Sequence, residues 1–107
     1  MKSHPISING NTGRISLPAR FDVMSTLNLR IPFGRLLTDA NTRKLVVDLS
    51  NLSYIDSMGI GTLIAWRQAC GENGKDLVLE KCSSHVTGML KLAGVERLFA
   101  FAPGAGS

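Results

Sequence analysis

The segment from Val46 to Gly61 constrains the fold of this chain more than any other part of it. The apolar run at its beginning is typical of a strand covered on both faces, and a short loop then delivers Asp56 and Ser57 to the first turn of an apolar helix. A helix start carries free backbone N–H groups and the positive end of the helix dipole, so the hydroxyl of Ser57 stands where a phosphate could sit. Gly59 and Gly61 leave this helix start without bulk and open to close approach. The layout is more typical of a phosphorylation switch with a docking surface than of a catalytic site.

Apolar spacing elsewhere in the chain predicts further strands and helices around this segment. Ile6 and Ile8 alternate with polar residues, and the alternation resumes over 14–17 after a glycine-rich turn, which predicts a β-hairpin. A helix is expected over about 25–37, capped by Asp22 or Ser25, from the spacing of Leu27, Ile31 and Leu36. Because Pro32 and Gly34 lie inside it, we expect a kink or a break there.

The remaining elements alternate along the chain. We expect a strand at 45–47, a helix over 57–70, a strand at 77–79, a helix that is capped by Ser83 or Ser84 and ended by Gly94, and a last strand at 98–101. These elements predict a single α/β domain over residues 1–107, with a loose tail from about 102. Its sheet would be mixed and mostly parallel, with about four to five strands and helices packed against it.

Composition and charge exclude several classes of protein. With 44% hydrophobic and 19% charged residues, the chain of 107 residues has the composition of a folded domain rather than a disordered segment. Its net charge of +4 comes from scattered basic residues, whereas a nucleic-acid-binding surface clusters them. The N-terminus lacks the apolar core of a signal peptide, Cys70 and Cys82 form no C-x-x-C pair, and no apolar run approaches the roughly 18 residues needed to span a bilayer. We therefore expect a monomeric cytoplasmic protein without nucleic-acid binding or membrane insertion.

The helix predicted from Ser57 onward lacks the charged outer face of an ordinary surface helix. On a helical wheel, Ile60, Leu63 and Ile64 share the side expected to face the sheet. The other side is apolar or small, with Met58, Thr62, Ala65, Trp66 and Ala69, and no charged residue occurs over 57–66. Such a face is either an interface or covered by another helix of the same chain. We expect an interface, with Trp66 at least partly exposed. The residues expected to contact a partner are Tyr54, Asp56, Met58, Gly59, Gly61, Thr62 and Trp66.

Less specific interpretations of the polar residues stay open. Ser57 can be an ordinary N-cap, and Asp56 can be the cap instead. Asp48 and Asp56 resemble a carboxylate pair, but no His, Lys or metal ligand is placed near them in the sequence. Catalysis by this pair is therefore not expected.

The sequence predicts no metal or cofactor site. His4 and His85 are isolated, and each is expected to be a surface or capping residue. The glycine pair of 59–61 lacks the third glycine of a dinucleotide-binding loop, and no Gly-Lys-Ser/Thr follows it. We expect a binding module and not an enzyme.

The stretch from Leu45 to Leu63 resembles the central motif of STAS domains, the family of the bacterial anti-sigma factor antagonists (anti-anti-sigma factors). In that family a D-S-x-G turn precedes the second helix, and its serine is phosphorylated by a cognate anti-sigma kinase. The resemblance maps the phosphoacceptor onto Ser57 and the adjoining acidic residue onto Asp56. It covers nearly the whole chain, through residues 13–15, 20–22, 74–79 and 86–94. Two departures are Met58, where the family often has a small residue, and the interruption of the first helix.

The resemblance implies a phosphorylation-controlled binding module. Unphosphorylated on Ser57, it would bind an anti-sigma or switch serine kinase through the second helix and the loop before it. Phosphorylation would release it, and a PP2C-type phosphatase would reset it. An alternative within the family is a constitutive STAS subunit that braces the ATPase of a lipid-transporting ABC complex. A receiver-type domain phosphorylated on Asp48 fits poorly, because residues 6–9 supply no acidic pair to hold Mg²⁺.

Overall fold

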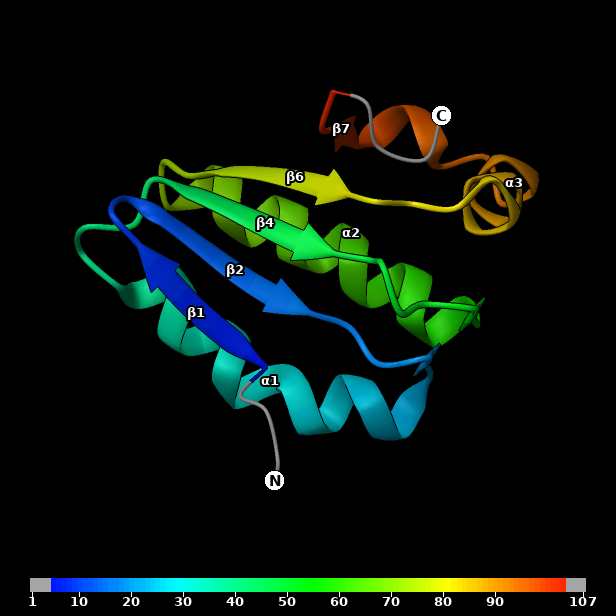
Figure 1. Ribbon diagram of the computed structural model, residues 1–107, viewed down its shortest axis with the longest axis horizontal. Helices are drawn as coiled ribbons and strands as arrows, with labels where there is room; N and C mark the ends of the chain where they lie inside the picture. Colours follow the sequence, from blue (N-terminus) through cyan, green and yellow to red (C-terminus); the bar gives the residue numbers. More distant parts are fainter. Residues whose placement is uncertain (1–4, 104–107) are drawn as a thin grey trace.

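A five-stranded sheet in the order β1-β2-β4-β6-β7 forms the centre of the structure, a computed structural model that describes residues 5–103 (Figure 1). Its strands are β1 (Ile6–Asn9), β2 (Thr12–Ser16), β4 (Lys44–Asp48), β6 (Asp76–Glu80) and β7 (Ala100–Phe101). A second, two-stranded sheet pairs β3 (Arg20–Phe21) with β5 (Tyr54–Ile55). The helices are α1 (Val23–Thr38), α2 (Ser57–Glu72), α3 (Ser84–Leu92) and the short 3-10 helix η1 (Glu96–Leu98).

The large sheet is mixed and mostly parallel, as the sequence predicts. β1 pairs antiparallel with β2 as the expected hairpin, whose turn contains Gly10 at a φ of 64°, a conformation that favours glycine. The other neighbouring strands of this sheet are parallel. Ile15, Val47 and Leu79 lie side by side in register and are fully buried. Figure 1 shows α1 and α2 behind the sheet, so the core lies between these two helices and one face of the strands.

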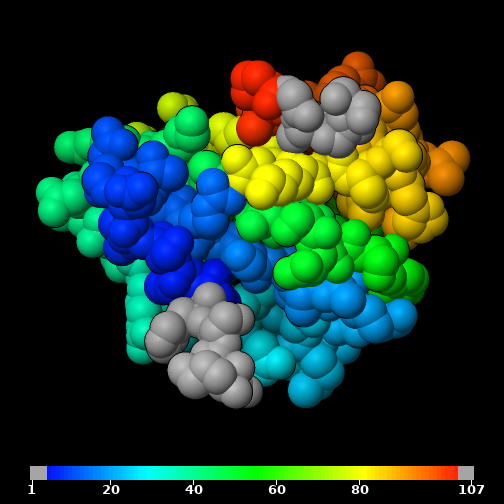
Figure 2. Space-filling view, in the orientation of Figure 1, coloured from blue at the N-terminus to red at the C-terminus, as the bar shows by residue number. Residues whose placement is uncertain are grey.

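The opposite face of the sheet carries an ion-pair cluster. The Arg14 guanidinium of β2 contacts the Glu80 carboxylate of β6, and its Nη1 lies 3.7 Å from Asp48 Oδ2 of β4. The hydrogen bond from Arg14 lowers the pKa of Glu80 below its usual value. Burial alone would raise the pKa of Asp48, but the Ser50 N–H and Arg14 outweigh it, so this pKa is lowered too. Figure 2 shows this face from the front, with β1, β2, β4 and β6 toward the viewer.

Helix α1 is longer and more continuous than expected. It begins at Val23, because Asp22 is its N-cap and accepts a hydrogen bond from Ser25 N at 3.2 Å. It then runs through Pro32 to Thr38, so the predicted break is wrong. Its ribbon in Figure 1 bends near the middle, as expected for a helix that holds a residue without an N–H.

The buried stripe of α1 also differs from the one that suggested a helix. Leu29, Phe33 and Leu36 are the buried residues of α1. Leu27 and Ile31 are instead exposed to solvent. The predicted spacing therefore identified the helix correctly but combined residues of two different faces.

The later elements follow the prediction closely. Ser83, the first of the two candidates, caps α3 by accepting a hydrogen bond from Val86 N at 3.1 Å. The expected last strand divides into η1 and the two-residue β7. Most of the predicted loose tail lies outside the described residues, as does His4. No helix of residues 5–103 is long and apolar enough to cross a membrane.

Lys75, just before β6, ties two connections of the fold together. Its side chain is nine-tenths buried, and its Nζ donates to the carbonyl oxygens of Asp39 at 3.0 Å and Thr42 at 2.6 Å. The Thr42 hydroxyl in turn donates to the Asp39 carboxylate at 2.7 Å. A buried ammonium is stable only with such partners, so this bond set fixes the link from α1 to β4 against the link from α2 to β6.

Candidate functional site

The first turn of α2 presents Ser57 to solvent. Asp56 is extended, with φ −103° and ψ −176°, and its Oδ1 accepts a hydrogen bond from Gly59 N at 2.9 Å. Asp56 is therefore the N-cap, and Ser57 is the first residue of the helix. The Ser57 side chain is exposed, and its hydroxyl makes no hydrogen bond to any residue in the described range 5–103. The capping task thus falls to Asp56 and leaves the Ser57 hydroxyl available.

Gly59 sets the position of this turn by packing against β3. A Cβ at Gly59 would lie 2.2 Å from the Phe21 carbonyl oxygen and 2.8 Å from Ile55 Cγ1. The helix start can approach β3 and β5 this closely only with glycine at this position. Gly59 is therefore buried, and the expectation that it stands open to a partner is wrong. Gly61 is exposed, with nothing within 4 Å of the position of a Cβ, as expected.

A groove of about 390 Å³ between α1 and α2 begins at Ser57. Its α2 side is formed by Ser57, Met58, Gly61, Thr62, Ala65 and Trp66. Its α1 side is formed by Thr26, Leu27 and Arg30. The fold thus brings four of the predicted contact residues together in one groove: Met58, Gly61, Thr62 and Trp66. Tyr54 lies outside the groove, on β5, and is exposed. The Arg20 guanidinium lies over one face of its ring, with Cζ 4.2 Å from the ring centre.

Trp66 is buried, which corrects the expectation that it is partly exposed. Only 5% of its surface is accessible, and its ring stacks on Phe33 of α1 with centroids 4.4 Å apart and planes 4° from parallel. Because α1 packs along the side of α2, the buried stripe of α2 is Gly59, Leu63, Trp66 and Cys70. Ile60 and Ile64 are only partly buried. At Trp66, the alternative of cover by another helix of the same chain is the correct one.

The sequence analysis missed the contribution of α1 to this face. Val23, Met24, Leu27 and Ile31 of α1 are exposed, as is Met58 of α2, which lines the groove together with Leu27. The signal lay in the composition of α1, whose 16 residues include two arginines and no acidic residue. A helix with so few charges has apolar residues left over for its outer face.

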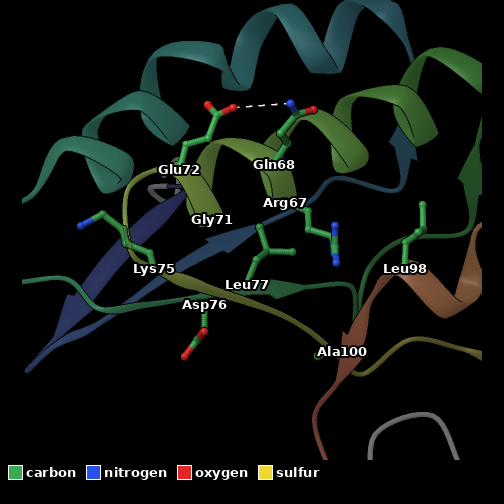
Figure 3. A pocket seen from close by; sticks show the side chains of 9 residues that line it. All are labelled: Arg67, Gln68, Gly71, Glu72, Lys75, Asp76, Leu77, Leu98 and Ala100. Carbon is green, nitrogen blue, oxygen red and sulfur yellow. Dashed lines mark hydrogen bonds between the residues drawn. The ribbon is translucent and has the colours of Figure 1, made fainter.

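A hollow at the opposite end of α2 does not resemble a ligand site (Figure 3). Its volume is about 530 Å³, between the end of α2, β6 and the segment around Leu98. Lys75 uses its ammonium on backbone carbonyls, and Gln68 donates to Glu72 at 3.4 Å. In Figure 3 the charged ends of Lys75, Asp76 and Arg67 point in different directions. A ligand site requires polar groups that converge on one point.

Catalytic and metal chemistry find little support in the described part of the chain. Residues 5–103 contain no group of three or more His, Cys, Asp or Glu side chains able to hold a metal ion. Asp48 faces Arg14 on the sheet, whereas Asp56 caps α2, so the two carboxylates serve separate structural tasks. His85 is exposed on α3.

Comparison with known proteins agrees with the predicted resemblance. The model of a family described as "Mlab, STAS domain" matches residues 4–100. A STAS-domain containing protein of Pseudomonas aeruginosa strain UCBPP-PA14 is 31% identical over 93 residues, 87% of this chain and 90% of that protein. An anti-sigma-B factor antagonist of Staphylococcus aureus is 32% identical over 57 residues, 53% of this chain and 53% of that protein.

Solved structures share the fold at low sequence identity. The Bacillus cell fate determinant SpoIIAA in its phosphorylated form gives a TM-score of 0.69 at 15% identity, covering 92% of this chain and 90% of that one. A sulfate transporter family protein from Wolinella succinogenes gives 0.75 at 18% identity, covering 89% and 80%. Since the family model and the Pseudomonas relative each span most of the sequence, this chain belongs to the STAS-domain family.

Proposed function

We propose that this protein is a phosphorylation-controlled binding module, an anti-sigma factor antagonist whose phosphoacceptor is Ser57. Unphosphorylated, it binds an anti-sigma or switch serine kinase, and phosphorylation by that kinase releases it. A PP2C-type phosphatase removes the phosphate. The observation that carries the proposal is the exposed Ser57 hydroxyl at the start of α2, at the end of an apolar groove. The anti-sigma-B factor antagonist among its relatives supports the same function.

The geometry of the groove provides a physical basis for the switch. A phosphate on Ser57 adds about −1.5 to −2 charges at neutral pH. In the free domain the helix N-terminus and water accommodate this charge. In a complex the same charge would be desolvated against the partner, which costs several kcal/mol unless a cation meets it.

The contact surface that we propose differs from the predicted one in two residues. Tyr54, Asp56, Met58, Gly61 and Thr62 remain on or near the surface and are proposed to contact the partner. Gly59 and Trp66 are buried and are proposed to act indirectly, because Gly59 positions α2 against β3 and Trp66 positions it against α1. We further propose that the protein acts as a cytoplasmic monomer, without catalysis, cofactor, nucleic acid or membrane insertion.

Titration of the candidate anti-sigma kinase with variants of Ser57 tests this function. Ser57→Ala should bind as tightly as the unphosphorylated protein, whereas Ser57→Asp should bind at least about tenfold more weakly. Ser84→Asp is a matched control, because Ser84 is also the exposed first residue of a helix but lies on α3. Equal affinities of the two Ser57 variants would refute the switch.

A second candidate is a constitutive subunit that braces the ATPase of an ABC transporter. A solved structure with the same fold is named as a sulfate transporter family protein, and a role beside a transporter is therefore kept as the alternative. In that case an ATPase should co-purify with the protein, and its affinity should be the same for Ser57→Ala and Ser57→Asp.

A further inference from the structure

The outer side of α1 and the start of α2 form one exposed apolar surface. Of the nine large hydrophobic side chains that are exposed within residues 5–103, five belong to it. They are Val23, Met24, Leu27 and Ile31 of α1 and Met58 of α2, each between 47% and 67% exposed. Exposed apolar side chains scattered singly need no explanation, whereas a gathered set marks an interaction surface. We call these five residues the α1 patch.

The shape of this surface suits a helix. Leu27 and Ile31 lie four residues apart, and with Val23 they form a straight stripe of about 12 Å along α1, roughly two helical turns. The groove between α1 and α2 runs beside it, with the small residues Gly61, Thr62 and Ala65 on the α2 side. Small residues let a backbone approach closely, and an amphipathic helix docks with its apolar face in such a groove.

The charges along the length of the α1 patch are positive, and its acidic neighbours are the two helix caps, Asp22 and Asp56, whose carboxylates accept hydrogen bonds from Ser25 N and Gly59 N. Arg30 lines the groove, and Arg35 follows Ile31 by one helical turn. Helix α1 has no acidic residue, and the only one in α2 is Glu72, at the far end from Ser57. A partner that covers the patch therefore meets guanidinium groups at the margin of the patch. Such groups favour a partner that carries carboxylates beside its own apolar face.

We propose that the α1 patch and its groove bind an acidic amphipathic helix of the partner protein. A second copy of this chain fits less well, because its α1 has no carboxylate to set against Arg30 and Arg35, and its nearest carboxylates, Asp22 and Asp56, already cap helices. A bilayer fits less well because it is flat, whereas the site is a groove. This inference rests on the proposed function for its regulation: a phosphate on Ser57 repels the carboxylates of a helix seated in the same groove.

The test uses synthetic amphipathic peptides of about 18 residues, long enough to form a helix. They share one apolar face and differ only in their flanking residues, which are all Glu, all Gln or all Lys. Isothermal titration should show that the Glu peptide binds tightest and the Lys peptide weakest. The double variant Leu27→Asp with Ile31→Asp should lose at least about tenfold in affinity for the Glu peptide. Arg30→Glu should reverse the preference between the Glu and Lys peptides.

Leu92→Asp is the control, because Leu92 is 92% exposed on α3, away from the α1 patch. Urea unfolding of each variant verifies that the fold is retained. The proposal is overturned if the α1 double variant behaves like Leu92→Asp, or if the Lys peptide binds as well as the Glu peptide. It is also overturned if the patch variants abolish self-association in sedimentation, or binding to anionic lipid vesicles, rather than peptide binding.

Two results separate this proposal from the proposed function. If the Glu peptide binds the wild type and Ser57→Asp equally, the groove assignment stands and the switch fails. If the candidate kinase discriminates between Ser57→Ala and Ser57→Asp but binds the α1 double variant as it binds the wild type, the switch stands and the groove assignment fails.

Discussion

At the scale of single residues, neighbouring glycines of α2 have opposite roles. Gly59 faces β3, where a Cβ would collide with the Phe21 carbonyl oxygen, and Gly61 faces solvent. The D-S-x-G pattern thus has a direct physical reason here. Asp56 caps the helix, and Gly59 lets its first turn pack on β3, so that the side chains of Ser57 and Met58 between them are exposed.

Alanine substitutions at these two glycines should therefore change stability in opposite directions. Gly59→Ala should lower the free energy of unfolding by about 1–3 kcal/mol, because the backbone of β3 cannot yield without disturbing its pairing with β5. Gly61→Ala should raise it by about 0.5–1 kcal/mol, since alanine favours the helix and meets no neighbour. Urea unfolding measures both. Equal effects of the two substitutions would contradict the packing of α2 on β3.

At the scale of elements, the hydrogen bonds of Lys75 hold the loop between α1 and β4 against the loop between α2 and β6. Its ammonium donates to two carbonyl oxygens of the α1–β4 link from a nine-tenths buried position. Lys75→Met keeps the buried stem but removes both bonds, so the Thr42 carbonyl loses this donor, whereas the Asp39 carbonyl keeps the hydrogen bond from Thr42 N at 3.3 Å. We expect a loss of about 2–3 kcal/mol in the free energy of unfolding. Lys44→Met, at an exposed position of β4, should change it by less than about 0.5 kcal/mol.

Phosphorylation should act on recognition and leave the helices in place. The start of α2 offers free N–H groups and a favourable dipole, so a phosphate on Ser57 should stabilise the isolated domain by about 0.3–1 kcal/mol or leave it unchanged. Amide NMR shifts should change chiefly over residues 55–62 and at nearby positions of α1. Shift changes throughout the sheet, or a loss of more than about 2 kcal/mol, would instead indicate a conformational switch.

The positions of the helices and strands can be predicted from the sequence more reliably than the faces that these elements bury. The strands at 45–47 and 77–79 and the helix from Ser57 follow from local patterns, because apolar runs and caps are read within a few residues. The burial of Trp66 depends on Phe33, which lies far from it in the sequence. Both helices are apolar on more than one side, so periodicity alone cannot decide that Trp66 is covered while Ile31 is exposed. The groove at Ser57 is a product of that packing and could not be predicted either.

At the scale of the whole molecule, the two faces of the sheet differ in what stabilises them. One face is covered by α1 and α2 through apolar packing. The other is crossed by the Arg14, Asp48 and Glu80 cluster, which joins three neighbouring strands. The first contribution does not depend on pH, whereas the second depends on the ionisation of two carboxyl groups.

Acid should therefore weaken the fold through the cluster of charges. The pKa values of Glu80 and Asp48 are lowered in the folded state, so their contribution is fully present above about pH 5 and is lost as pH falls through the folded values. Arg14→Gln removes their common partner, and its destabilisation relative to the wild type should be largest near neutral pH. At about pH 3, where the wild type has begun to lose this contribution, the difference should be smaller than near neutral pH. Urea midpoints of the two proteins at both pH values measure this. A difference that persists or grows in acid would mean that Arg14 stabilises the sheet through its packed side chain rather than through its charge.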